Sequence, residues 1–400
     1  MRPPLRKNPL VRTRAPLLPP AIRSRTALGL TAAAAQGRFQ LQVCANCAAV
    51  QYPPREICVA CLGHALPWRD VPDGGTLIAT TTVRISADPY FRERTPWRTG
   101  LVAMECGPVV IAHLPACVTQ GDRVRLALKL DRAGQGVMVA LPLAPPSDLL
   151  DDPVMREMTC DPADRRVLVT EGRGPVGRAV ARAMLAAGAS VLLGVAETWK
   201  PFAPVEGAET IELDLTGADS VRRCAAAYGG RLEIVVNTGL HARPGGILAR
   251  GDLTTARTEM EAAYFSPMRL AQALGPALQA RAADGTHSAC AWVNVLSVYA
   301  LANLPPWGAF SAAQAAGLSL AQALRADLRP IRVVNALIGP LDDEWHQAIP
   351  PPKLAPAVLA SAIVQALRDG REDIAVGDVA QDILARWRDD PKILERELAT

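Results

Sequence analysis

Four cysteines in two Cys-x-x-Cys pairs are the residues whose chemistry the sequence specifies most closely. Cys44 and Cys47 form the first pair, Cys58 and Cys61 form the second, and ten residues separate the pairs. Each pair can turn both sulfurs toward one point, so the four thiolates can surround one tetrahedral ion. Zinc suits this set because it prefers sulfur and has no redox chemistry, and iron is the alternative. With all four positions filled by protein, we expect a structural ion.

Other interpretations of the cysteines fit the rest of the chain less well. Two disulfides or a redox pair would suit an oxidising compartment, which nothing else in the sequence indicates. His64 lies three residues after Cys61 and could replace one ligand, but with four cysteines present we expect it at the surface. The other five cysteines follow no pattern and are expected to be reduced, buried thiols: Cys106, Cys117, Cys160, Cys224 and Cys290.

A glycine-rich turn in the second half of the chain could also do chemistry. The apolar run 166–170 precedes the turn Gly172-Arg-Gly174-Pro-Val-Gly177, and a helix over 178–187 and a strand over 190–195 follow it. Strand, turn and helix in this order are typical of a dinucleotide-binding unit, in which backbone N–H groups at the helix start face a pyrophosphate. The glycine spacing alone is a weak signal, and its position between strand and helix strengthens it.

Length and composition predict a soluble cytoplasmic protein of two domains. The chain has 400 residues, half of them apolar, and no apolar run long enough to cross a membrane. Its excess of positive charge comes from the first 38 residues, which hold eight basic residues and no acidic one. We interpret this proline-rich segment as an extended arm that docks on a partner. Simple disorder and a mitochondrial presequence are the alternatives, although prolines oppose the helix that a presequence needs.

The first half then reads as a helix, a metal ribbon and a barrel. A helix over 26–36 ends at Gly37, and a strand over 39–43 enters the ribbon. Five short β-like runs follow at 75–85, 101–105, 109–114, 124–130 and 137–141, a pattern that suits an OB-type Greek-key barrel. Residues 69–132 are nearly balanced in charge and lack aromatics spaced for base stacking, so we expect no nucleic-acid partner.

The loop over 84–98 is the one part of the barrel region with clustered basic and aromatic side chains. It could bind a phosphate-bearing ligand such as coenzyme A, but an ordinary solvated loop is the preferred interpretation. Its arginines are Arg84, Arg92, Arg94 and Arg98, and its aromatics are Tyr90, Phe91 and Trp97.

The order of motifs over about residues 20–145 resembles the zinc-ribbon and OB-fold accessory proteins that accompany thiolases. Besides the helix and the cysteine pairs, the motifs are Gly37-Arg38-Phe39, Tyr52-Pro53-Pro54-Arg55, Trp68, Gly75-Thr76-Leu77 and Gly121-Asp122-Arg123-Val124. The resemblance implies an acyl-CoA context and a protein partner, which would be a thiolase, a related acyltransferase or a thiolase-like aldolase. The cysteine spacing alone indicates only the metal.

Beyond a proline-containing boundary, residues 165–345 resemble the short-chain dehydrogenase/reductase family. The resemblance rests on the glycine-rich turn, on Asp214-Leu215, on Val236-Asn237-Thr238-Gly239 and on the strand Val293–Ser297. It implies a Rossmann-type, doubly wound parallel sheet, completed by a strand at 373–376 and a final helix from Ala380. It also implies an NAD(P) site formed by Thr170, Gly172, Gly174, Gly177, Asp214, Asn237 and Gly239.

We therefore expect five segments along the chain. They are a basic arm and helix (1–36), a zinc ribbon (37–68), an OB fold (69–144), a linker (145–164) and a Rossmann domain (165–400). The prolines at 350–352 stand where substrate-lid helices lie in the resembled family, so a short or stiff lid is expected there.

The glycine-rich turn departs from the family pattern. Glu171 and Pro175 replace two of its glycines, and Pro175 has no N–H to offer a phosphate. Val195 stands where an acidic or basic residue normally selects between NAD and NADP. These departures weaken the case for NAD(P) binding.

The catalytic set of the resembled family, a Tyr, a Lys, a Ser and an Asn, is also mostly replaced. The family spacing places Phe310 at the Tyr position, Gln314 at the Lys position and Tyr264 at the Asn position, while Ser297 remains. Loss of positioned acid–base help costs ~10²–10⁴ in rate. Tyr299 is the one nearby candidate for a relocated acid, and its pKa is expected near ~10 because no cation neighbours it in sequence.

Two functions follow from these patterns. The first is a non-catalytic or scaffold subunit of an acyl-CoA-processing complex, of the β-oxidation type. The ribbon and barrel would bind a thiolase-like enzyme. The Rossmann part would pair with a dehydrogenase subunit or with itself, through the helix over 311–328. The alternative is a 3-hydroxyacyl-CoA dehydrogenase-like enzyme with a rearranged site that uses Ser297 and Tyr299.

Overall fold

The computed structural model describes residues 17–283, 289–347 and 349–399. Most of the predicted basic arm, residues 1–16, lies outside the described residues. The described chain forms two compact units, which are treated separately below. The N-terminal unit ends at Asp161 and also includes Arg368–Arg371, and the C-terminal unit contains the other residues from Pro162 onward. Within the described residues, no helix combines the length and apolar character that crossing a membrane requires.

The N-terminal unit begins with a short helix and a ribbon. The 3₁₀ turn η1 (Arg25–Ala27) leads into helix α1 (Leu28–Gln36), which ends at Gly37 in the left-handed conformation with φ of 67°. Strands β1 (Gln40–Val43), β2 (Val50–Gln51) and β3 (Trp68–Asp70) form an antiparallel sheet in the order β2-β1-β3. The two cysteine-bearing turns project from this small sheet.

Five strands then close into a barrel in the order β4-β5-β6-β8-β7. Their bounds are β4 (Gly74–Val83), β5 (Trp97–Met104), β6 (Val109–His113), β7 (Arg123–Leu130) and β8 (Gly136–Pro142). Apolar side chains alternate along β7, so one face of that strand is buried. Leu30, Ala33 and Ala34 of α1 belong to the barrel's hydrophobic core. The predicted all-β barrel is confirmed, with α1 contributing to its core.

The segment expected to be a linker contains ordered structure. The 3₁₀ turn η2 (Leu149–Asp151) leads into helix α3 (Pro153–Met158), where the Asp152 side chain accepts the Val154 amide and Pro153 occupies the first turn. Val154, Met155 and Met158 pack with Trp97 and Leu141 of the barrel. A second short helix, α2 (Pro89–Arg92), lies in the loop between β4 and β5.

The C-terminal unit is built on a seven-stranded sheet whose neighbouring strands are all parallel, in the order β11-β10-β9-β12-β13-β14-β15. The strand order reverses between β9 and β12, and such a switch point forms a ligand crevice in doubly wound folds. The bounds are β9 (Arg166–Val169), β10 (Ser190–Val195), β11 (Glu209–Glu212), β12 (Ile234–Asn237), β13 (Ala291–Ser297), β14 (Arg332–Ile338) and β15 (Asp373–Val376).

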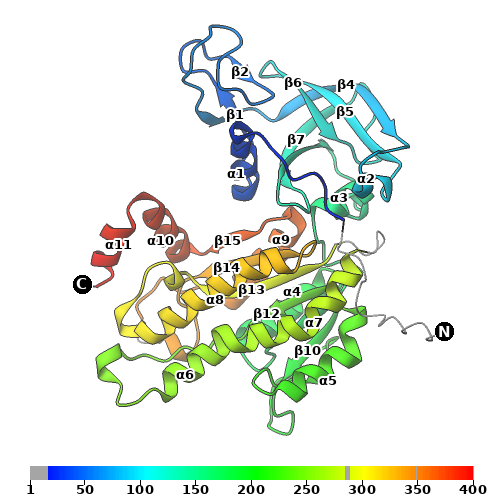
Figure 1. Ribbon diagram of the computed structural model, residues 1–400. Coiled ribbons are helices and arrows are strands. Elements are labelled where there is room, and N and C mark those ends of the chain that lie inside the picture. The colour runs from blue at the N-terminus through cyan, green and yellow to red at the C-terminus, as the bar shows by residue number, and fades with distance from the viewer. Residues whose placement is uncertain (1–16, 284–288, 348, 400) are drawn as a thin grey trace, which may run out of the picture. The chain divides into compact units, whose positions relative to one another are not determined.

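Helices cover this sheet. As a result, β12, β13 and β14 are buried along their whole length. Helices α5, α7 and α8 pack on one face around Leu168, Val235 and Trp292, and lie in front of the sheet in Figure 1. The helices of the unit are α4 (Pro175–Ala186), α5 (Ala218–Tyr228), α6 (Thr254–Met260), α7 (Ser266–Ala282), α8 (Gly308–Asp327), α9 (Pro356–Asp369), α10 (Asp378–Asp389) and α11 (Pro391–Glu397).

Candidate functional sites

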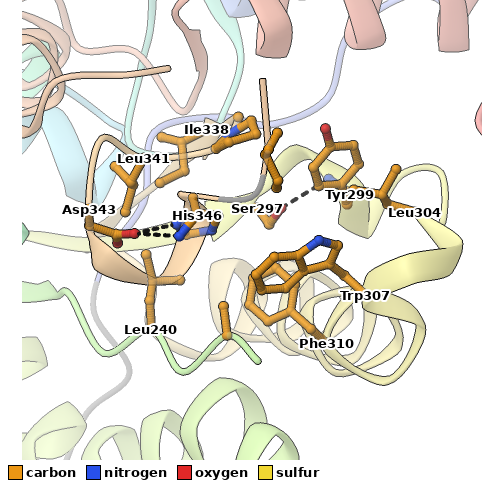
Figure 2. Close-up of a pocket in the computed structure, with 14 residues that line it drawn as sticks. Leu240, Ser297, Tyr299, Leu304, Trp307, Phe310, Ile338, Leu341, Asp343 and His346 are labelled. Carbon is orange, nitrogen blue, oxygen red and sulfur yellow. Dashed lines mark hydrogen bonds and ion pairs between the residues drawn. The ribbon is translucent and has the colours of Figure 1, made fainter. Parts of the chain in front are cut away.

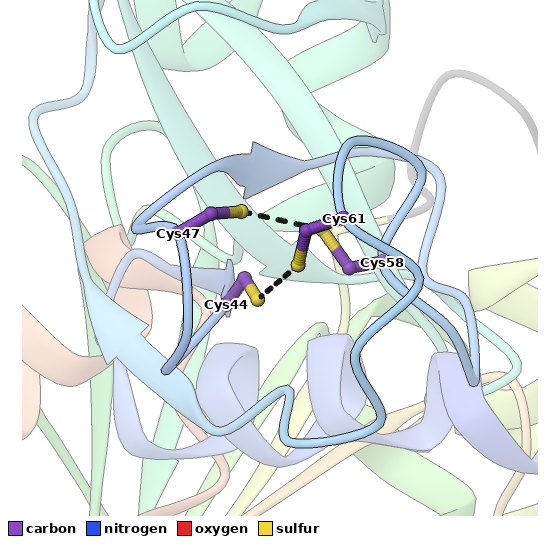
Figure 3. A group of neighbouring side chains, drawn as sticks. All are labelled: Cys44, Cys47, Cys58 and Cys61. Carbon is purple, nitrogen blue, oxygen red and sulfur yellow. Dashed lines mark hydrogen bonds between the residues drawn. The ribbon is translucent and has the colours of Figure 1, made fainter.

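The four predicted metal ligands converge on one point (Figure 3). The sulfurs of Cys44, Cys47, Cys58 and Cys61 all lie within 4.8 Å of one another. The Cys44–Cys61 and Cys47–Cys58 sulfur pairs are each 3.6 Å apart. A disulfide requires about 2.05 Å, whereas zinc–sulfur bonds of about 2.3 Å give tetrahedral edges of about 3.8 Å. The set therefore fits a closed structural zinc site, as predicted.

Two equivalent turns present these sulfurs. The Ala48 amide donates to the Cys44 carbonyl, and the Leu62 amide donates to the Cys58 carbonyl. Ala48 and Leu62 both have a φ of 59°, which reverses the chain just after each pair. Backbone amides of Cys47 and Asn46 lower the pKa of the Cys44 thiol to about 6, which favours the thiolate that a metal binds. His64 is exposed and lies outside the cluster, as expected.

The remaining cysteines are free thiols, but they are not uniformly buried. Cys160, Cys224 and Cys290 are buried, and burial raises the pKa of Cys224 to about 11. Cys117 is exposed and Cys106 is half-buried, so the prediction of five buried thiols is wrong for these two. Both lie near turns at the ends of barrel strands, where the chain reaches the surface.

The arginine-rich loop over 84–98 is organised by internal contacts. Arg92 donates to two backbone carbonyls of its own loop, and Arg98 donates to three carbonyls between residues 115 and 118. Arg94 forms a 3.0 Å ion pair with the buried Glu157, which also pairs with Arg132 and accepts the Tyr90 hydroxyl. Three of the four arginines therefore have structural roles. Their guanidinium groups are engaged within the chain, which does not favour the hypothesis that this loop binds coenzyme A.

The residues of the expected nucleotide site do meet at the switch point of the sheet. Thr170 follows β9 and Asn237 ends β12. The Thr170 hydroxyl donates to the Asn237 amide oxygen at 3.3 Å and accepts the Thr238 amide. A Cβ on Gly177 would lie 1.7 Å from the Glu171 carbonyl oxygen, so only glycine fits there. The fold therefore brings the motif residues together as the resemblance implied.

The start of α4, where a pyrophosphate would lie, carries a carboxylate of the chain itself. Gly174 is the residue before the helix, and no side chain caps it. The Glu171 carboxylate accepts the Arg173 amide at 2.8 Å. Burial raises the pKa of Glu171, while the backbone amides of Arg173 and Gly174 oppose that rise. An anionic side chain thus uses amides that would otherwise face a phosphate.

The neighbouring part of the crevice is occupied by Arg173. Its guanidinium lies against the loop after β10, where Val195 takes the usual selector position. It donates to the backbone carbonyl oxygens of Ala196, Glu197, Lys200 and Pro201. The residues present at this turn do not fit a dinucleotide pyrophosphate, because one side chain repels it and another fills the adjoining loop.

The remaining residues of the expected nucleotide site form hydrogen bonds with nearby main-chain groups. The Asp214 carboxylate accepts both the amide and the hydroxyl of Thr216. The Gly239 amide donates to the Asn237 side chain at 3.4 Å. Gly172 donates to the Gly194 carbonyl at 2.7 Å, and a Cβ there would lie 2.5 Å from Leu193. Open space surrounds the Cα of Gly174.

A second pocket lies beside the carboxyl ends of β13 and β14 (Figure 2), and Ser297 lines it. Phe310 also lines the pocket and packs with Ala242 and Trp307. Gln314 points to the strand instead, because its side-chain oxygen accepts the Ser297 amide at 2.9 Å. The position expected for a basic residue is thus filled by a buried structural hydrogen bond.

Of the two tyrosines singled out in the sequence, only Tyr299 lines this pocket. Tyr299 lines the pocket, but its hydroxyl points away from Ser297 in Figure 2, and burial raises its pKa above the value expected. Tyr264 lies in a π-helical turn (Glu261–Phe265) and packs against the core beneath α5, α7 and α8. Tyr264 is not among the residues that line the pocket with Ser297.

Sequence reasoning missed a histidine–aspartate pair in this pocket. His346 Nδ1 lies 2.6 Å from Asp343 Oδ1, and the same oxygen accepts the His346 amide at 3.0 Å. The imidazole stacks on Trp307 with ring centroids 5.3 Å apart. The pair lies 46 residues or more beyond Ser297, at the short 3₁₀ helix η8 (Glu344–His346). Its Asp-x-x-His spacing in a polar run gave no signal strong enough to single it out.

Ribbon, barrel and parallel sheet define a zinc-binding fusion protein with a Rossmann unit, and comparisons with known proteins identify its parts. Three family models match: the ChsH2 rubredoxin-like zinc ribbon domain at residues 31–67, the ChsH2 C-terminal OB-fold domain at 68–129, and short chain dehydrogenase at 165–352. The chain belongs to the short-chain dehydrogenase family and carries ChsH2 zinc-ribbon and OB-fold domains at its N-terminal end.

Individual relatives support the assignment of the C-terminal unit. A crystal structure of a short chain dehydrogenase from Burkholderia cenocepacia J2315 in complex with NADP is 30% identical, with a TM-score of 0.55, over 60% of this chain and 99% of that chain. The short-chain dehydrogenase cctT of Talaromyces islandicus is 31% identical over 185 residues, 44% of this chain. The match spans 62% of the length of that curated relative.

Proposed function

We propose that this protein is a partner subunit of an acyl-CoA-processing assembly. The zinc ribbon and barrel dock on a thiolase-like acyltransferase or aldolase, and the Rossmann unit transfers no hydride. This unit pairs instead with a dehydrogenase subunit or with a second copy of itself. The observation that carries the proposal is a partner-type ribbon and barrel on one chain with a dehydrogenase fold whose nucleotide cradle holds Glu171.

An apolar patch on the outside of the barrel supports docking. The barrel patch consists of Ile78, Leu101, Val109 and Ile111, which are 45%, 40%, 46% and 58% exposed. Leu101 and Ile111 are paired across β5 and β6, and Val109 pairs with Ala103 two residues along, on the same face. Neighbouring exposed apolar side chains of this kind mark surfaces that bind other proteins.

Three features of the C-terminal unit support the absence of hydride transfer. Phe310 has no proton to give, and Gln314 has no charge and is committed to the Ser297 amide. Glu171 places a carboxyl group against the amides at the start of α4. Each change alone weakens dehydrogenase chemistry, and together they remove the acid, its activating cation and the anion site.

The docking proposal is tested by co-expressing the chain with each thiolase-like protein of its source organism. Complex formation is measured by size-exclusion chromatography with light scattering. We expect one of these proteins to form a stable complex. Ile111→Asp should weaken that complex at least about tenfold, because an aspartate in a dry interface loses its hydration.

Ile393→Asp provides the matched control for this test. Ile393 lies on α11 of the other unit and is 56% exposed, close to the 58% of Ile111. The control should leave the complex intact. A chain that forms no complex with any thiolase-like protein would contradict the proposed partner role.

The alternative is a dehydrogenase that uses Ser297 and Tyr299, which both line the pocket. It requires NAD(P)-dependent turnover of a 3-hydroxyacyl-CoA that Tyr299→Phe abolishes. The raised pKa of Tyr299 disfavours it, because a phenol with no neighbouring cation is a weak proton donor at neutral pH.

A further inference from the structure

The second half of strand β4 has an unpaired edge. Residues 74–76 pair with β7, and the Leu77 amide and carbonyl bond with the backbone of the turn before β7. Over residues 78–83, β4 pairs with β5 alone among the strands that the structure describes. A bulge between Leu77 and Ala79 explains the change, because a bulge bends its strand away from a neighbour. One row of backbone N–H and C=O groups is therefore open to another strand.

This free edge, residues 78–83, lacks the features that keep other edges from pairing. Its sequence, Ile-Ala-Thr-Thr-Thr-Val, contains no charged residue and no proline, and its β-branched residues favour strands. The side chains of residues 80–82 are all exposed. By contrast, the edge strand β11 of the C-terminal sheet carries Glu209 and Glu212. Because charges and prolines are the usual protection of an edge, the free edge of β4 is competent to pair.

Symmetry and the ends of the free edge fix how two copies of it can pair. In an antiparallel pair, two opposite residues either bond to each other or both point their backbone groups away. Two copies of one strand must therefore place one residue opposite itself on the two-fold axis. An axis at Thr80 would bring Leu77, whose backbone is already bonded, into the pairing. An axis at Thr81 avoids this and places Ile78 opposite Arg84.

The charges at the ends of the free edge suit a second copy of the chain. Arg84 is exposed, and among the described residues it has no hydrogen-bond or ion-pair partner. Asp122, whose carbonyl accepts the Leu77 amide, carries a carboxylate that bonds with Thr119 and forms no ion pair in the described chain. With the axis at Thr81, Arg84 of each copy lies beside the Asp122 turn of the other. Opposite charges then meet at both ends, and the paired residues between them are uncharged.

We propose that the free edge of β4 binds the free edge of a second copy of this chain, antiparallel about a two-fold axis through Thr81. The two barrels then share one continuous sheet in the order β5-β4-β4-β5. Pairing uses main-chain groups at the edge of the sheet, whereas the barrel patch lies on its face, so both contacts can form at once. This self-pairing goes beyond the proposed partner role and does not rest on it.

A cysteine placed on the axis tests the register. Thr81→Cys is made together with Cys117→Ser, which removes an exposed thiol of the barrel, and the zinc-loaded full-length chain is mildly oxidised. Directly opposite residues have Cβ atoms about 4.5–5.5 Å apart, whereas diagonal neighbours are about 7–8 Å apart. We expect a covalent dimer on non-reducing gels from Thr81→Cys, and at least about tenfold less from Thr80→Cys, because a disulfide cannot span the diagonal.

Thr210→Cys is the matched control for cross-linking. Thr210 is an exposed threonine on the charged edge strand β11, and its cysteine variant should give no covalent dimer. Equal cross-linking of Thr80→Cys and Thr81→Cys, or none from either, would overturn the proposal.

A charge on the free edge tests the association without a cross-link. Thr81→Lys sets two lysines opposite each other and should weaken self-association at least about tenfold in sedimentation velocity, whereas Thr210→Lys should not. A wild-type chain that stays monomeric, or association that Thr81→Lys leaves unchanged, would contradict the pairing. If the chain alone is monomeric and Thr81→Lys instead abolishes a complex with a thiolase-like protein, a strand of that protein and not a second copy occupies the edge.

Discussion

At the residue scale, Glu171 places a carboxyl group in a turn that otherwise has the geometry of a dinucleotide-binding unit. The strand, the turn and helix α4 have the form of a dinucleotide unit, and Gly177 retains the close approach that only glycine allows. Yet the Glu171 carboxyl group accepts the amide at the position where phosphate is expected. A negative charge on this carboxyl group would repel a phosphate that approached the same amide.

We therefore expect Glu171→Gly to increase NADPH affinity at least about tenfold, an effect that calorimetry can detect. Glu171→Gln is the control, because it removes the charge but keeps a side-chain oxygen on the amides. If both variants gain affinity equally, charge alone closes the site. If neither gains affinity, Pro175 and Arg173 rather than Glu171 exclude the nucleotide.

The sequence alone could show that a side chain lacks the group that a catalytic role requires. Phe310 and Gln314 could be recognised because neither can supply a proton or a positive charge. Contacts formed by folding were not predictable. Nothing local to Glu171 shows that its carboxyl group turns back on the helix start, and only the fold brings His346 into a pocket with Ser297.

At the scale of elements, the zinc ribbon has too small a core to hold its two turns without a metal. Ribbon strands of two to four residues leave the cysteine-bearing turns dependent on the ion. Structural zinc contributes about 10–16 kcal/mol in comparable small domains. Removal of the metal should therefore unfold the ribbon while leaving the parallel sheet folded.

The assignment of the metal ligands can be tested by substituting two exposed cysteines, one inside the cluster and one outside it. Cys47→Ser should reduce bound zinc, measured by atomic emission, from about one ion per chain to a small fraction, because one of four ligands is lost. Cys117→Ser changes an exposed thiol outside the cluster and should retain the metal. Equal zinc content in the two variants would contradict the assignment of the ligands.

The contact between barrel and α3 depends on a buried carboxylate. Glu157 is 3% exposed, and although burial alone would raise its pKa, Arg132 and Arg94 hold that pKa below its usual range. Glu157→Gln leaves two guanidiniums without their counter-charge and should reduce the free energy of unfolding by about 3–5 kcal/mol in urea denaturation. Glu105→Gln, at an exposed pair with Arg123, should cost less than about 1 kcal/mol.

The same carboxylate predicts a pH dependence. Because the pKa of Glu157 is lower in the folded chain than in the unfolded chain, its stabilisation is present above the unfolded value, about 4.3, and is lost as pH falls through the folded value. The stability difference between wild type and Glu157→Gln should narrow below about pH 4. A difference that stays constant down to pH 2 would show that packing, not charge, explains it.

The types of element were more predictable than their edges. Alternating apolar runs indicated the five barrel strands, and β10 and β15 match their predicted bounds. Helix α3 was missed because prolines and aspartates around it resemble a linker, whereas Asp152 and Pro153 in fact start the helix. Its stability comes from packing on Trp97, which no local pattern reveals.

At the scale of the whole molecule, the chain joins two domain types that are each known from other proteins. ChsH2 ribbon and barrel domains precede a short-chain dehydrogenase fold in a single polypeptide. In the proposed function the first unit recruits a thiolase-like enzyme and the second pairs with a dehydrogenase subunit or with a second copy of itself. The central claim is that the second unit does not work as a nucleotide-dependent dehydrogenase.

Calorimetric titration of the zinc-loaded, full-length chain with NADH and NADPH tests this claim most directly. The account predicts no binding at micromolar concentrations of either nucleotide, because the Glu171 carboxylate accepts an amide of the cradle and Pro175 has no N–H to offer a phosphate. Micromolar binding of either nucleotide would contradict it, and would make hydroxyacyl-CoA oxidation by Ser297 and Tyr299 the leading function.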